Sequence, residues 1–107
     1  MNLISNNPET LEVTGIKELS GAAAGAARDQ IKQALKPAHN GLEVNLSETT
    51  FVDSSGLGAV VSALKYMGDK GRLHLCAVTP GVMAVLKLTR MDRVLKTFDS
   101  RQAAIAA

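Results

Sequence analysis

Apolar and polar residues alternate in three short segments of the chain, and alternation with a period of two predicts β-strands. These segments are 10–14 (TLEVT), 42–46 (LEVNL) and 72–78 (RLHLCAV). The first is typical of a half-buried strand that ends in a turn at Gly15, and 94–98 (VLKTF) reads as a short last strand. Phe51 and Val52 form a further short apolar pair that leads into a helical pattern.

Between these strands, apolar residues recur at the spacing of an α-helix. The alanine-rich segment 21–36 follows Ser20, a natural N-cap, and stops at Pro37. A second helix begins near Ser54 and ends in the glycine-flanked segment 68–71. A third opens at Thr79 or Pro80, and a fourth, 101–107, follows Asp99 or Ser100 as its cap. The apolar face of the second helix consists of Leu57, Val60, Val61, Leu64 and Met67.

The order of these elements predicts the fold class. Strand and helix alternate four times, which favours a mixed, mostly parallel sheet of four to five strands with about four helices. A chain of 107 residues with 46% hydrophobic and 21% charged residues can fold alone. We therefore expect one α/β domain over 1–107, with a core at about 10–99 and a C-terminal helix at 99–107.

Charge and cysteine content narrow the function classes. The net charge is only +2, and the basic residues are scattered without interleaved aromatic residues, so direct binding of nucleic acid is not expected. Cys76 is the one cysteine, which excludes an internal disulfide and favours a buried role in a reducing compartment. The first residues lack a secretory pattern, and the longest weakly charged stretch, 50–64, is too short for a membrane span. We expect a cytoplasmic protein that does not contact a membrane.

The segment 51–61 (FVDSSGLGAVV) contains the strongest candidate chemistry. Its Gly-Leu-Gly lacks the third glycine of a dinucleotide fingerprint, because Val61 stands there, and no phosphate-loop lysine follows. A nucleophile elbow needs glycine two residues before the serine, whereas Ser54 has Val52 and Ser55 has Asp53 at that place. With two histidines and one cysteine, a metal site is not expected either. These absences leave serine hydrolysis poorly supported, and we expect no cofactor.

The start of the second helix has a feature that capping alone does not explain. Asp53 or Ser54 can cap its first turn. Gly56 and Gly58, however, each cost about 1 kcal/mol relative to alanine inside a helix, so we expect another surface to approach this backbone closely. A phosphate on Ser54 would lie at the favourable end of the helix dipole. Phosphorylation would therefore act on binding rather than on folding.

These residues resemble a known family. The run 53–58 (DSSGLG), preceded by Phe51 and Val52 and followed by an amphipathic helix, is similar to the phosphorylation loop of the STAS-domain anti-sigma factor antagonists. The similarity runs from about Leu11 to the end of the chain and includes the strand LHLCAV, the segment 79–82 (TPGV) and the late strand VLKTF.

The resemblance implies a partner switch with Ser54 as the phosphorylated residue, in a protein that is not itself an enzyme. The unphosphorylated form would bind an anti-sigma factor, a serine kinase of the histidine-kinase-like ATPase type, and so free a sigma factor. Phosphorylation would release that partner, and a serine phosphatase would reset the switch. Carried over by position, Asp53 would assist the acceptor, and Gly58 would let the partner's backbone approach. The remaining loop residues, which would shape the partner-binding surface, are Ser55, Gly56 and Leu57.

Two departures from the family pattern leave alternatives open. Few residues precede TLEVT, so we expect a short or missing first strand, whose bare neighbour can then pair with a second copy of the chain as a homodimer. Ser20 stands where the family commonly has an aspartate, which favours a non-switching STAS scaffold or a subunit of a signalling or lipid-transport complex. A third hypothesis is a small serine hydrolase that uses Ser54 or Ser55 with His74.

Overall fold

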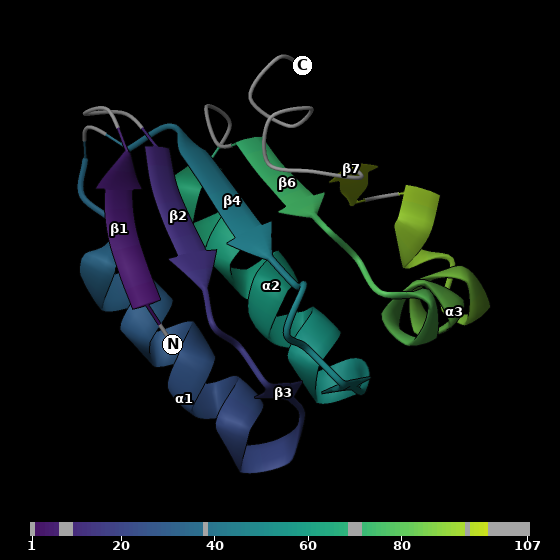
Figure 1. Ribbon diagram of the computed structural model, residues 1–107. Coiled ribbons are helices and arrows are strands. Elements are labelled where there is room, and N and C mark those ends of the chain that lie inside the picture. Colours follow the sequence, from purple (N-terminus) through teal and green to yellow (C-terminus); the bar gives the residue numbers. More distant parts are fainter. Residues whose placement is uncertain (1, 7–9, 38, 69–71, 94, 99–107) are drawn as a thin grey trace.

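One five-stranded mixed sheet forms the centre of the molecule (Figure 1). The computed structural model describes residues 2–37, 39–68, 72–93 and 95–98, apart from 7–9. Three neighbouring pairs of strands run parallel, and only the first strand is antiparallel to its neighbour. This agrees with the predicted mostly parallel sheet. The strands, in spatial order, are β1 (Asn2–Asn6), β2 (Thr10–Thr14), β4 (Gly41–Asn45), β6 (Arg72–Cys76) and β7 (Lys96–Phe98).

Two long helices cover one face of this sheet and pack against each other. Helices α1 (Gly21–Ala34) and α2 (Ser54–Met67) lie behind the strands in Figure 1. The shorter α3 (Pro80–Leu88) lies to one side and is followed by the 3₁₀ helix η2 (Met91–Arg93). Within the described residues the chain thus has three α-helices. The predicted fourth helix at 101–107 lies outside the described residues.

The predicted helix boundaries have identifiable causes. The α1 helix ends at Ala34, and Leu35 is already extended, as expected two residues before Pro37. The α2 helix ends at Gly68, whose φ of 76° is in the left-handed region that favours glycine. Thr79 caps α3, because its Oγ1 accepts a hydrogen bond from the backbone N–H of Val82. Pro80 follows as the first helical residue, where its missing N–H costs nothing.

The core lies between the sheet and the two long helices. Alternate residues of the three central strands point toward the helices and are almost completely buried. They contact apolar residues on the inner faces of α1 and α2, such as Ile31 and Ala63. The core is aliphatic, as expected from a chain with only 3% aromatic residues. The strand residues of this layer are Leu11, Val13, Leu42, Val44, Leu73 and Leu75.

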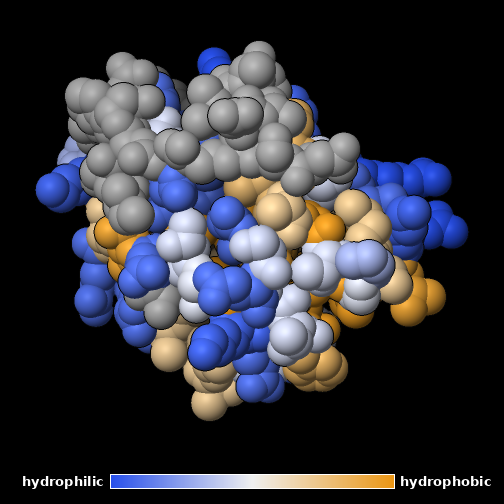
Figure 2. Space-filling view, viewed as in Figure 1, coloured by the Kyte–Doolittle hydropathy of each residue, from blue (hydrophilic) through white to orange (hydrophobic). Residues whose placement is uncertain are grey.

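Polar residues alternate with these core positions on the other face. Glu12, Glu43 and His74 are register partners across β2, β4 and β6. Figure 2 shows that the side of the molecule away from α1 and α2 is mainly hydrophilic where the atoms are coloured. Glu12 and Glu43 are nevertheless 8% and 4% exposed, so the prediction of a half-buried β2 is wrong. The alternation of apolar and polar residues predicts which face of the sheet a residue lies on. It does not predict how far the neighbouring strands bury that residue from solvent.

The first strand is present, contrary to expectation. Residues Asn2–Asn6 pair antiparallel with β2 along their whole length, from Asn2 opposite Thr14 to Asn6 opposite Thr10. Of the two predicted possibilities, a missing strand is therefore wrong, and a strand of five residues, as long as β2, is present. The polar sequence NLISN lacks the β-branched pattern of a strand, and pairing with β2 supplies its order instead. Because β1 covers the edge of β2, the reason given for a homodimer no longer holds.

Candidate functional site

A second, two-stranded sheet builds the site at one end of α1 and α2. Strand β3 (Glu18–Leu19) runs parallel to β5 (Phe51–Val52), and α2 starts directly after β5. The backbone N–H of Thr50 donates to the carbonyl of Lys17, and the N–H of Asp53 donates to that of Leu19 at 3.3 Å. The segment before α1 is therefore fixed to the segment before α2, and both helices begin at the same end of the molecule (Figure 1).

Buried Thr49 strengthens this attachment. Its Oγ1 donates a hydrogen bond of 2.6 Å to the carbonyl of Ile16, and its side chain is 1% exposed. Its own carbonyl accepts from Thr79 Oγ1 at the start of α3. Thr49 thus joins its own segment, which precedes β5, to the segment before β3 and to the start of α3.

Asp53 caps two helices with one carboxylate. Its Oδ1 accepts a hydrogen bond from the backbone N–H of Gly56 in the first turn of α2 at 3.0 Å. Its Oδ2 accepts from the N–H of Gly21, the first residue of α1, at 3.3 Å. Of the two caps predicted for α2, Asp53 is therefore the one observed. Its reach to α1 could not be expected from local sequence, because the two residues are 32 positions apart.

Ser20 occupies the N-cap position of α1, as predicted, but its side chain does not cap the helix. Its Oγ instead donates a hydrogen bond of 2.6 Å to Oε1 of Glu18. The residue is 7% exposed, so its hydroxyl is held within the β3 layer. Asp53 therefore supplies the negative charge at the first turn of α1. Glu18 of β3 instead accepts the hydrogen bond of Ser20.

Ser54 and Ser55 are the first two residues of α2, and both are exposed. The N-terminal end of a helix carries unsatisfied N–H groups and the positive end of the helix dipole, which favour an anion there. Phe51, on the strand that leads into the helix, is 54% exposed. Sequence reasoning named Phe51 as part of the motif but not as a site residue. The available signal was its position directly before Val52. Because neighbouring residues of a strand point to opposite faces, a buried Val52 places Phe51 on the outside.

The two glycines of the motif have different surroundings. A Cβ on Gly56 would lie 1.8 Å from the carbonyl oxygen of Leu19, so the approach that requires this glycine is made by β3 of the same chain. Gly58 is exposed, and a Cβ there would meet nothing within 4 Å. The expectation that an outside surface approaches the backbone therefore remains open only at Gly58. Leu57 between them is 6% exposed and belongs to the core, so it supports the site from beneath.

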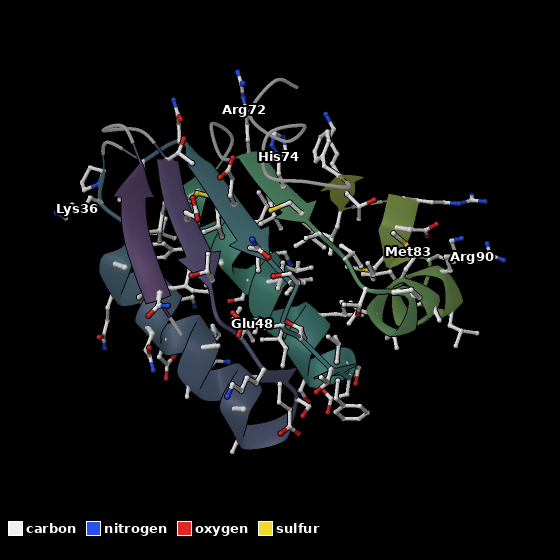
Figure 3. The ribbon with its side chains drawn as sticks, viewed as in Figure 1. Lys36, Glu48, Arg72, His74, Met83 and Arg90 are labelled. Atoms are coloured by element: carbon white, nitrogen blue, oxygen red, sulfur yellow. The ribbon has the colours of Figure 1, made fainter. Side chains whose placement is uncertain are left out.

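The structure does not bring the serines and His74 together. Figure 3 places His74 on β6, toward the end of the sheet opposite the start of α2. Its ring makes an edge contact with Phe98, with ring centroids 4.8 Å apart. Among the residues the structure describes, no three His, Cys, Asp or Glu side chains are grouped to hold a metal ion. Cys76 is completely buried, as predicted.

Comparison with known proteins identifies the family. Residues 4–104 match the family model of the STAS domain, so the chain belongs to the STAS-domain family. It is 33% identical over 67 residues to a protein of Thermotoga maritima assigned as an anti-sigma factor antagonist, which covers 62% of this chain and 59% of that protein. It is 26% identical over 90 residues to the anti-sigma F factor antagonist of Paenibacillus polymyxa, covering 82% of this chain and 77% of the relative.

Solved structures show the same fold. A crystal structure of a Thermotoga maritima protein of this class superposes with a TM-score of 0.88 at 24% identity, covering 98% of this chain and 91% of the other. The anti-sigma factor antagonist SpoIIAA in its unphosphorylated form gives a TM-score of 0.80 at 24% identity, with 97% and 91% covered. The phosphorylated form of SpoIIAA, from Bacillus, gives 0.68 over 98% and 96% of the two chains. In the described part of this chain, no helix is both long and apolar enough to cross a membrane.

Proposed function

We propose that this chain is an anti-sigma factor antagonist whose partner binding is switched by phosphorylation of Ser54. The observation that carries the proposal is the position of Ser54, exposed at the first residue of α2 and adjacent to a carboxylate that fixes both long helices. A kinase can reach this hydroxyl without unfolding any part of the domain. The names of the two curated relatives, and the solved structures of SpoIIAA in unphosphorylated and phosphorylated forms, support the same role.

The energetics favour a switch in binding over a switch in folding. A phosphate on Ser54 would be stabilised by about 0.3–1 kcal/mol at the helix N-terminus. Asp53 already accepts the nearest N–H groups, so repulsion from its carboxylate offsets part of this gain. A partner docked over Ser54 would instead have to bury two new negative charges, which costs several kcal/mol when they stay unpaired. Since 1.4 kcal/mol is a factor of ten, we expect affinity to fall at least about a hundredfold.

The partner in this proposal is an anti-sigma factor that is also a serine kinase of the histidine-kinase-like ATPase type. The unphosphorylated protein would bind it and free a sigma factor, and a serine phosphatase would restore that form. Asp53, besides capping the helices, would position the acceptor hydroxyl. The whole cycle would take place in the cytoplasm, where sigma factors act.

Phosphorylation by the cognate kinase tests the proposal. The protein is incubated with kinase and ATP, and the modified residue is located by mass spectrometry. We expect phosphate on Ser54, no modification of Ser54→Ala, and normal modification of Ser55→Ala, its matched exposed neighbour. Calorimetry should show that Ser54→Asp binds the kinase at least about tenfold more weakly than the wild type. Modification at Ser55 instead, or equal affinity of Ser54→Asp, would contradict the proposal.

One observation favours a second candidate, a STAS scaffold that binds without switching. The resemblance places an aspartate where this chain has Ser20, and the Ser20 hydroxyl is already engaged by Glu18. A kinase that requires the carboxylate of that aspartate would meet the Ser20 hydroxyl instead, with Glu18 as its hydrogen-bond partner. A protein that binds its partner tightly, is never phosphorylated, and is indifferent to Ser54→Asp would support the scaffold role. The hydrolase hypothesis gains nothing from the geometry, because His74 lies away from both serines.

A further inference from the structure

A pocket lies at the ends of α1 and α2 that are farthest from Ser54. Its volume is about 370 Å³, near the lower end of the range of about 300–1,000 Å³ that small-molecule sites occupy. Both helices contribute to it where they end, and Figure 3 places Lys36 at the edge of the molecule away from β3 and β5. The pocket is lined by Leu35, Lys36, Pro37, His39, Tyr66 and Met67.

Tyr66 and Lys36 line the pocket, and a second lysine, Lys32, lies beside the Tyr66 ring. Tyr66 is 59% exposed, although large aromatic side chains are usually covered. The Nζ atom of Lys32 lies 5.9 Å from the centre of its ring, and Lys36 is an exposed lining residue. None of the described residues that line the pocket is acidic. Among the described residues, two lysines therefore lie beside a flat apolar surface.

Two hydrogen bonds connect Lys36 and His39 in the wall after α1. The backbone N–H of Lys36 donates to Nδ1 of His39 at 2.9 Å, and the N–H of His39 donates to the carbonyl of Lys36 at 2.9 Å. Pro37 between them has a fixed φ, and His39 is buried.

We propose that this pocket is a binding site for a small planar aromatic anion. The ring would stack against Tyr66 with the Met67 thioether at its edge, and the carboxylate or sulfonate group would pair with Lys32 and Lys36. A neutral aromatic compound would form no ion pair with the lysines, and an aliphatic anion would not stack on the Tyr66 ring. The volume suits a small molecule better than a folded protein segment. The site is independent of Ser54 and of the function proposed above.

A matched pair of probes tests the charge requirement. Indole-3-acetate and its neutral analogue indole-3-acetamide have nearly the same shape, and each is titrated into the ¹⁵N-labelled full chain at low ionic strength. We expect saturable chemical-shift changes centred on residues 35–39 and 66–67, with the acetate binding about three- to fivefold more tightly. This preference should vanish in the double variant Lys32→Gln/Lys36→Gln. It should also shrink in about 0.5 M salt, because at that concentration charges interact over only a few ångströms.

Aromatic substitutions test the ring requirement. Tyr66→Ala should weaken the acetate about three- to tenfold, and Tyr66→Phe should retain binding. Because Tyr66 is mostly exposed, its substitution leaves the core intact. Phe51→Ala, the matched exposed aromatic at the other end of the molecule, should change nothing. The proposal is overturned by any of three results: no saturable shifts up to about 5 mM probe, equal affinity for acetate and acetamide, or shifts centred on Phe51.

Discussion

The two glycines of the 53–58 motif should respond in opposite ways to the same substitution. In Gly56→Ala, the added Cβ would lie 1.8 Å from the carbonyl oxygen of Leu19, where real Cβ contacts are not shorter than about 3.0 Å. In Gly58→Ala, the Cβ has no neighbour within 4 Å. Both residues lie in the first turns of α2, so helix propensity changes equally in the two variants and cancels in their comparison.

The expected magnitudes come from three terms. Alanine gains about 1 kcal/mol of helix propensity over glycine at both positions. At Gly56, Leu19 must move by more than an ångström, which costs about 1–3 kcal/mol in strain and repacking. The same movement breaks the 3.3 Å hydrogen bond from the Asp53 N–H to the Leu19 carbonyl, which is worth about 1 kcal/mol. We expect Gly56→Ala to lose about 1–3 kcal/mol of stability and Gly58→Ala to gain about 0.5–1 kcal/mol.

Urea denaturation followed by circular dichroism measures both free energies of unfolding. Gly56→Ala should move the unfolding midpoint to lower urea, and Gly58→Ala should move it to higher urea, with an unchanged slope in each case. If the two variants were equally stable, β3 would not approach α2 as described, and Gly56 would have to be explained by an outside partner. In that case Gly56→Ala would impair kinase binding without any loss of stability.

The remaining predictions concern the hydrogen bonds beneath the site. Asp53→Ala should lose about 2–3 kcal/mol by urea denaturation, because it removes the cap of α1 and that of α2 together. Ser20→Ala should lose no more than about 1 kcal/mol, because it removes only the bond to Glu18; a larger loss than in Asp53→Ala would refute the shared cap. Thr49→Val should lose about 1–3 kcal/mol in thermal unfolding, since the buried Ile16 carbonyl loses its partner, and a neutral result would contradict that bond.

The local sequence pattern was sufficient to predict those elements for which several signals, such as an apolar stripe and a cap, agree. The α2 helix has an apolar stripe, a polar cap and a terminal glycine, and it forms where all three predict it. Thr79 and Pro80 fix the start of α3 in the same way. The parallel order of β2, β4 and β6 follows from the helices between them, because a helix is the usual connection between parallel strands.

Features that depend on partners distant in sequence were not predictable. β1 is ordered by its pairing with β2, and β3 is a two-residue strand that exists because β5 lies beside it. The second hydrogen bond of Asp53 needs α1 and α2 to start side by side, which only the folded chain brings about. The sequence located Ser54 and Gly58 correctly at an exposed helix start, but it could not tell that Gly56 serves the interior.

Gly56 faces the interior and Gly58 faces outward, and this difference also defines the surface that a partner would use. Helical geometry places Gly56 and Leu57 on the inner side of α2, against β3 and the core. Ser54, Ser55 and Gly58 share the outer side of the first turns, and all three residues are small. A partner's backbone can approach such a face closely, and a phosphate on Ser54 would be its one bulky and strongly charged group. The same small residues that would permit binding would therefore make binding sensitive to a single phosphorylation.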